Sequence, residues 1–191
     1  MSDRSDICAD VNGRIGRFSL LKFPFMKMLK YCLLAMLTFL AVQTQAQNKS
    51  LPEVTVKTLK GESTNLKKFA ENGKITVISF WATWCAPCKK ELDAIHEVYA
   101  DWQEDYGMEL VAVSIDTRRA VATVPGMVAS KGWDYTVLTG KATELQNAFN
   151  FQTIPQTFLV DQNGQIVYHH NGYVPGDEYE LEDKIKALAG K

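Results

Sequence analysis

The sequence predicts an α/β domain with a mixed central sheet that begins at about Leu51. From that residue onward, short apolar runs typical of strands alternate with segments of helical period. The run Ile75–Trp81 is rich in β-branched and aromatic residues and nearly continuous in apolarity, as expected of a strand covered on both faces. The Asn163-Gly164 pair between two later apolar runs favours an antiparallel hairpin. We therefore expect parallel and antiparallel strands in one sheet.

The composition is that of an ordinary globular protein. The 191 residues carry a net charge of −1, with 46% hydrophobic and 23% charged residues, a balance typical of a folded domain rather than of a disordered chain. No Lys- and Arg-rich run of the kind that binds a phosphate backbone is present, so nucleic acid is not an expected partner.

The N-terminal part of the chain contains a segment that resembles an export signal. Two lysines precede an apolar run of about 12 residues that ends at Val42, shorter than the roughly 20 residues needed to cross a bilayer. Thr44 and Ala46 provide the small residues of a cleavage site. Residues 26–46 therefore predict a signal peptide cleaved after Ala46, and an uncleaved membrane tether through residues 28–42 is the alternative.

The remaining domain boundaries follow from this assignment. Residues 1–25 precede the signal and carry no usable motif, which indicates a mis-assigned start codon, since Met26 or Met28 would be a more natural start. Residues 47–50 are polar and predict a linker, and residues 51–191 form the predicted domain. We expect a periplasmic or otherwise exported protein, with or without a membrane tether.

The first part of the domain predicts an accessory hairpin. Leu51–Val56 has the pattern of an edge strand, and Lys60-Gly61 suits a turn. Asn65 can cap a short helix that ends at Ala70.

The central strand leads into the longest predicted helix. From Pro87 to Trp102, apolar side chains recur every three or four residues, which predicts about 16 residues of helix with one buried stripe and a charged opposite face. The later elements are a strand at 109–115, a helix inserted after it at 124–131, a strand at 133–138, a helix at 142–150, hairpin strands at 158–161 and 165–169, and a C-terminal helix capped by Asp177.

Cys85 and Cys88 form the pair of chemical interest. Cys8 and Cys32 lie in the N-terminal segments excluded above, so the domain keeps a single Cys-x-x-Cys pair. A bridge that closes so small a loop adds little stability, which argues against a purely structural disulfide. Half of a zinc or iron–sulfur site is another interpretation, but no second cysteine pair follows. The sequence therefore implies neither a metal nor a cofactor.

The position of the pair favours a thiolate. Cys85 comes where a buried strand meets the start of a helix, and the unpaired backbone N–H groups there stabilise negative charge. In such motifs the cysteine pKa falls below its ordinary value of about 8.5. We predict Cys85 as the nucleophile and the more buried Cys88 as the cysteine that resolves the mixed disulfide. Pro87 suits the first helical turn because its missing N–H leaves no hydrogen bond unmade.

Glu91 is a candidate proton acceptor. It follows Cys88 by three residues and therefore lies beside it on the apolar face of the helix. A carboxyl group there would be partly desolvated, which raises its pKa, and it could take the proton that Cys88 must lose. A boundary glutamate that pairs with Lys90 in solvent is the alternative, and geometry alone leaves both open.

Two motifs carry a resemblance to a known family. Phe80–Glu91, with the sequence FWATWCAPCKKE, resembles the active-site segment of the TlpA/ResA-like family of exported, thioredoxin-fold thiol–disulfide oxidoreductases. Thr153–Asp161, followed by the Asn-Gly turn, resembles the cis-proline strand of that family, and the order of elements from Leu51 to Leu188 fits it. The resemblance implies a thioredoxin-like fold with an N-terminal strand or hairpin extension and an inserted helix.

The resemblance also implies roles for site residues. Pro155 would be cis and face the disulfide, with the backbone of Ile154 free to pair with an extended substrate. Cytosolic thioredoxins carry a buried aspartate where this chain has Ser79, so Glu91 would take over the handling of the proton. The expected substrate contacts are Trp84, Ala86, Pro87, Ile154 and Pro155.

The predicted function is the reduction of disulfides in exported proteins, and the resemblance implies targets such as apocytochrome c. The expected partners are protein thiols and disulfides, together with a membrane-bound or exported redox protein that recycles the pair. A peroxiredoxin-like peroxidase on the same fold and a non-catalytic partner-binding module are the alternatives. Ala86-Pro87 between the cysteines does not fix whether the protein reduces or oxidises its substrates.

Overall fold

The structure is a computed structural model that describes residues 49–190. The predicted signal or tether at residues 26–46 and the predicted extension at residues 1–25 lie outside this range. Within residues 49–190, no helix has both the length and the apolar character needed to span a membrane.

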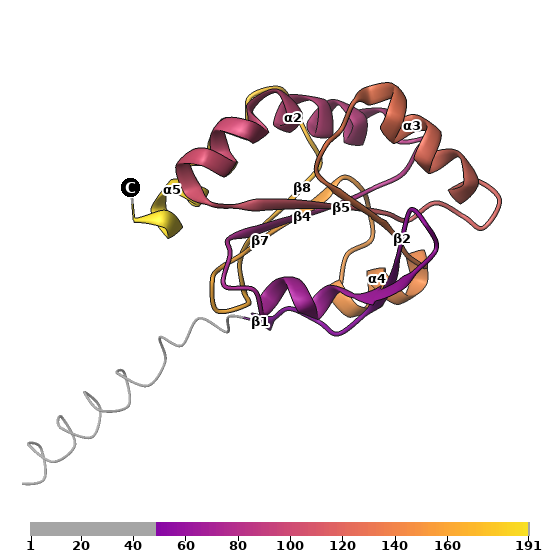
Figure 1. The fold of residues 1–191 in the computed structure, drawn as a ribbon, viewed down its shortest axis with the longest axis horizontal. Coiled ribbons are helices and arrows are strands. Elements are labelled where there is room, and N and C mark those ends of the chain that lie inside the picture. Colours follow the sequence, from indigo (N-terminus) through magenta and orange to yellow (C-terminus); the bar gives the residue numbers. More distant parts are fainter. Residues whose placement is uncertain (1–48, 191) are drawn as a thin grey trace, which may run out of the picture. The chain divides into compact units, whose positions relative to one another are not determined.

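An eight-stranded mixed sheet forms the centre of the domain (Figure 1). Its strands are β1 (Lys49–Ser50), β2 (Thr55–Thr58), β3 (Ser63–Asn65), β4 (Thr76–Trp81), β5 (Glu109–Ser114), β6 (Thr136–Thr139), β7 (Gln156–Val160) and β8 (Gln165–Asn171). They lie in the order β1-β8-β7-β4-β5-β6-β2-β3. β4 pairs in parallel with β5, and β5 with β6, whereas β7 is antiparallel to both β4 and β8. The predicted mixed sheet is confirmed.

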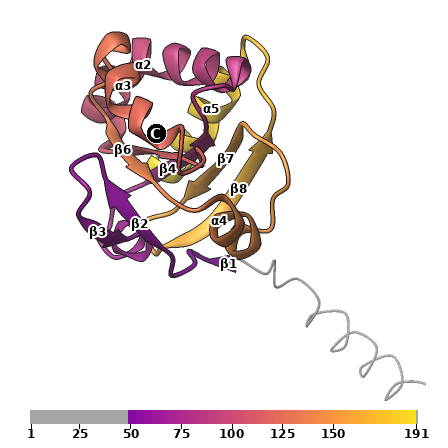
Figure 2. The ribbon, with the colours of Figure 1, turned by 90° about the vertical axis from the view of Figure 1, so that its right-hand side faces the viewer.

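Helices cover both faces of this sheet (Figures 1 and 2). One face carries α2 (Ala86–Tyr106), α3 (Val124–Lys131) and α5 (Asp177–Ala189), and the other carries the 3-10 helix η1 (Leu66–Ala70) and α4 (Ala142–Phe149). A short 3-10 helix, η2 (Val121–Thr123), leads into α3. The predicted helix after the second core strand is therefore present, and α2 and α5 pack against each other.

The central strand β4 organises the core because all six of its residues are buried. Alternate side chains point to opposite faces, as in any strand. Phe80 faces α4, where its ring meets that of Phe149 edge-on at 4.8 Å and stacks on that of Phe151 at 4.7 Å. Trp81 points the other way and packs edge-on against Trp133 at 5.1 Å. This alternation leaves Ser79, on the same face as Trp81, pointing toward α2.

Several boundaries differ from the prediction where the apolar pattern is a poor guide. The long helix runs to Tyr106, beyond the last apolar stripe residue, and ends only where Gly107 adopts a left-handed backbone with φ 63°. The strand expected at 133–138 begins at Thr136, because the pairing with β5 starts there, opposite Val111.

The predicted N-terminal hairpin is present, but its strands lie at other residues than expected. The predicted linker, residues 47–50, ends in a short strand. The first hairpin strand is Thr55–Thr58, and Asn65 caps η1 by accepting a hydrogen bond from Lys67 N–H. Lys49 and Ser50, expected to be linker, pair with β8 as β1. Both side chains of β1 are exposed, so no apolar pattern in the sequence predicts this backbone pairing.

The C-terminal helix is present, but Asp177 does not cap it. The cap residue is Gly176, at φ 110°, and Asp177 is the first residue inside α5. Its carboxylate accepts a hydrogen bond from Val174 N–H and lies 3.1 Å from the ring of His170. The side chain is thus turned back toward β8.

Candidate active site

Cys85 and Cys88 form a disulfide where the chain passes from β4 to α2. Their Cα atoms are 5.4 Å apart. Cys85 is the cap residue of α2, with an extended backbone, and its sulfur accepts a hydrogen bond from Cys88 N–H at 3.3 Å. Cys85 is 4% exposed, whereas Cys88 is fully buried. The reachable sulfur therefore lies at the positive end of a helix, where an anionic form is stabilised.

The loop before the cysteines is tied to the end of β5 by Asp116. The buried Asp116 carboxylate accepts hydrogen bonds from the backbone N–H and the hydroxyl of Thr83, at 2.9 and 2.7 Å, and from the Ser114 hydroxyl at 2.8 Å. Bonds to a charged acceptor in a partly desolvated place are strong. They fix the turn from which Cys85 projects.

Asp116 is not among the site residues that the sequence predicted. The available signal was an acidic residue directly after a buried parallel strand, because the carboxyl ends of neighbouring parallel strands share one edge of the sheet. Lys89 adds a second restraint, since its Nζ donates to the Thr83 carbonyl at 3.0 Å. The loop that contains Thr83 is therefore hydrogen-bonded both to Asp116, after β5, and to Lys89, in α2.

Glu91 lies one turn beyond Cys88 on the buried face of α2, between helix and sheet. Its two oxygens accept hydrogen bonds from the Thr157 hydroxyl at 2.6 Å and the Ser79 hydroxyl at 2.9 Å. Ser79 and Thr157 are paired residues of β4 and β7, so their hydroxyls emerge side by side on one face of the sheet. Glu91 is therefore an inward-facing carboxyl and not a boundary glutamate in solvent.

Burial shapes the proton affinity of Glu91. Desolvation raises the pKa of its carboxyl from 4.5 to about 7, although the hydrogen bonds from Thr157 and Ser79 oppose that rise. The charge of His170 also lowers the pKa of Glu91, and the charge of Asp177 raises it. A carboxyl that titrates near neutral pH can both accept and return a proton.

The Ile154–Pro155 peptide bond is cis, as the resemblance implied. Gln156, the next residue, pairs with Phe80, so Pro155 lies at the sheet edge where β4 ends and the cysteine loop begins. The Pro155 carbonyl accepts a hydrogen bond from Gly172 N–H at 2.9 Å. Strand pairing in β7 starts only at Gln156, which leaves Ile154 outside the ladder and partly exposed.

An apolar surface surrounds the disulfide. Trp84 is 65% exposed, and Ala86 and Pro87 are exposed in the first turn of α2. The neighbouring Trp81, by contrast, is fully buried. The structure thus brings the predicted contact residues Trp84, Ala86 and Pro87 to the surface beside Cys85.

Comparison with known proteins agrees with this geometry. Residues 47–169 match the AhpC/TSA family. The chain is 29% identical over 140 residues to the thiol-disulfide oxidoreductase ResA of Bacillus thuringiensis subsp. konkukian, covering 73% of this chain and 77% of that protein.

Solved structures show the same fold. A thioredoxin-like protein from Porphyromonas gingivalis is 44% identical, with a TM-score of 0.66 over 73% of this chain and 92% of that one. A putative thiol:disulfide interchange protein DsbE from Chlorobium tepidum is 24% identical, with a TM-score of 0.66 over 75% of this chain and 97% of that one. The predicted thioredoxin-like fold is confirmed. The chain belongs to the AhpC/TSA family and is a thioredoxin-fold thiol–disulfide oxidoreductase.

Proposed function

We propose that the protein reduces disulfide bonds of exported proteins, with Cys85 as the attacking and Cys88 as the resolving cysteine. The observation that carries the proposal is the arrangement along α2. One sulfur caps the helix on a residue that keeps 4% exposure, the second is fully buried one turn on, and a carboxyl with a pKa near 7 lies a turn beyond. Each group sits where one step of disulfide exchange needs it.

The reaction begins with attack by the Cys85 thiolate on a substrate disulfide. The substrate S–S bond breaks, a Cys85–substrate disulfide forms, and one substrate thiolate leaves. Glu91 then accepts the proton of Cys88, and the Cys88 sulfur displaces the second substrate thiolate from Cys85. The Cys85–Cys88 disulfide is formed, and two electrons have passed from the protein to the substrate.

The surface next to Cys85 suits an unfolded polypeptide as substrate. Trp84 and Pro87 offer apolar contact, and Ile154, outside the ladder at the same sheet edge, offers backbone groups to an extended segment. An apocytochrome c before haem attachment is a substrate of this kind. The signal-like segment at residues 26–46 supports action outside the cytoplasm, where a membrane-bound or exported redox partner would return the pair to the dithiol form.

Insulin reduction tests the activity. The unmodified protein should accelerate reduction in the presence of a dithiol, and Cys85→Ser should abolish the effect, while equal rates for the two would refute the proposal. A reduction potential near −270 mV would fit a reductant, and one near −120 mV would instead indicate a disulfide-forming enzyme. Peroxide consumption that survives loss of Cys88 but not of Cys85 would indicate a peroxidase.

A further inference from the structure

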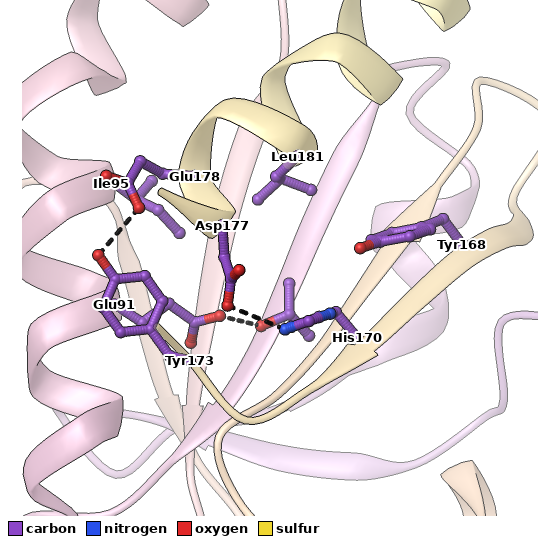
Figure 3. A pocket seen from close by; sticks show the side chains of 9 residues that line it. Glu91, Ile95, Tyr168, His170, Tyr173, Asp177, Glu178 and Leu181 are labelled. Atoms are coloured by element: carbon purple, nitrogen blue, oxygen red, sulfur yellow. Dashed lines mark hydrogen bonds and ion pairs between the residues drawn. The ribbon is translucent and has the colours of Figure 1, made fainter. Parts of the chain in front are cut away.

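A small cavity lies next to Glu91, between α2, α5 and the strands β7 and β8 (Figure 3). The buried Glu91 is one of its lining residues, and its other ionisable lining groups include His170, Tyr173, Asp177 and Glu178. The space open to the centre of a water molecule is about 10 Å³, which is room for one water among several polar partners. The cavity therefore joins a buried carboxyl to groups that reach the surface.

A row of polar side chains crosses the sheet beneath this cavity. Ser79 pairs with Thr157 across β4 and β7, and Thr157 pairs with His170 across β7 and β8. Paired residues point to the same face of a sheet. The row starts with the two hydroxyls that hold Glu91 and ends with an imidazole, and both the Glu91 carboxyl and that imidazole line the cavity (Figure 3).

His170 is held in place by Asp177 and is open to solvent. The His170 Nε2 atom lies 3.1 Å from the Asp177 carboxylate, whose position is fixed by the Val174 N–H at 2.8 Å. The two side chains are 33% and 22% exposed, whereas Glu91 is 5% exposed. The pair thus contacts the cavity on one side and water on the other.

Two other polar side chains around the cavity, Tyr173 and Glu178, hydrogen-bond to groups other than Glu91. The Tyr173 hydroxyl donates to Glu178 at 2.9 Å, and Glu178 also accepts from Gly176 N–H. Burial raises the pKa of Tyr173 and of Tyr168, so neither phenol ionises near neutral pH. Histidine is the side chain that gains and loses a proton in that range.

We propose that His170 and Asp177 act on the redox site through Glu91. The pair carries to solvent the proton that Glu91 accepts from Cys88. The inference rests on the proposed function, because it concerns the step in which Cys88 attacks. The proton leaves the Cys88 sulfur, binds the Glu91 carboxylate, and passes through the cavity to the His170–Asp177 pair. This transfer returns Glu91 to its ionised form, and release of the proton from the exposed imidazole to solvent returns the His170–Asp177 pair to its starting state.

A single-turnover oxidation can follow this proton directly. The reduced protein is mixed with one equivalent of dithiobis(nitrobenzoate) at about pH 8, above the Glu91 pKa of about 7. The coloured nitrothiobenzoate product binds no proton at this pH. The second equivalent of colour reports the attack by Cys88, and a pH-indicator dye in weak buffer reports the proton that it loses.

Proton release should keep pace with the second colour step in the unmodified protein. In His170→Ala, the proton should lag behind that step by about tenfold or more, and added imidazole, which fits the space left by the ring, should remove the lag. His170→Phe should show the lag without rescue, since its ring fills that space. His169→Ala is the matched control, because the exposed His169 lies on the other face of β8 beside Phe158, and it should show no lag.

Two results would overturn the inference in different ways. Proton release that keeps pace in both His170→Ala and His170→Phe would remove the relay and leave the redox function intact. Failure of the unmodified protein to release the second equivalent of colour would refute the proposed function itself, and the relay with it.

Discussion

Replacing Glu91 by glutamine should make the protein more stable at alkaline pH. Below pH 4.5 the carboxyl is protonated in the folded and unfolded chains alike. Between pH 4.5 and about 7, the unfolded carboxyl ionises while the folded one keeps its proton, because burial raises its pKa to about 7. The unfolded state then binds fewer protons, so the free energy of unfolding falls as pH rises. At 1.36 kcal/mol per pH unit, the loss is about 3 kcal/mol and is complete above about pH 7.

Glutamine does not ionise and should escape this loss. The Ser79 and Thr157 hydroxyls can each donate or accept, so they can bond to an amide as well as to a carboxyl. Glu91→Gln should therefore match the unmodified protein near pH 4 and exceed it by about 3 kcal/mol near pH 8.

Urea unfolding of the disulfide form at a series of pH values measures this difference. Glu97→Gln, on the exposed face of the same helix, is the matched control, and its difference from the unmodified protein should stay within about 0.5 kcal/mol throughout. If the stability difference for Glu91→Gln were the same at pH 4 and pH 8, the argument that burial holds Glu91 protonated would be refuted.

Three further outcomes are expected. Cys88→Ala should accumulate mixed disulfides with substrate proteins, seen as reducible adducts by mass spectrometry, and an absence of adducts would contradict a resolving role. Asp116→Ala removes the acceptor of one buried donor, on Ser114, and of two part-buried donors, on Thr83, and should cost about 3 kcal/mol in urea unfolding, with Asp116→Asn costing less; equal stability would contradict the anchoring role. Gly164→Ala should be strongly destabilising, because φ is 74° and the added Cβ would lie 2.6 Å from that of Ala70. The control Gly61→Ala, with φ 88° and nothing within 4 Å, should lose only about 1 kcal/mol of backbone strain, and equal losses would contradict the packing argument.

The sequence was informative wherever function depends on neighbours along one element. Cys85, Cys88 and Glu91 lie within two turns of α2, so helical spacing made Glu91 a candidate neighbour of Cys88, and the family resemblance favoured that over a glutamate in solvent. The nearly continuous apolar run of β4 likewise predicted that this strand lies buried at the centre of the sheet.

Residues brought together by strand register were beyond that reasoning. Thr157 and His170 reach the site because β7 lies between β4 and β8 with a particular alignment, and a shift by one residue would turn both to the other face. No periodicity within β7 or β8 encodes that alignment. Asp116 was missed for a related reason, since its partner Thr83 lies in a loop that has no regular pattern.

The near-complete burial of Cys85 has a consequence for selectivity among disulfides. With 4% of this residue open to solvent, a partner's sulfur can approach it only along a narrow direction. Thiol–disulfide exchange depends on such access as well as on thiolate content. A disulfide in a rigid, folded segment cannot adopt the orientation that this approach requires, whereas a disulfide in an unfolded segment can. We therefore expect the protein to discriminate by local mobility around the target bond more than by the residues that flank it.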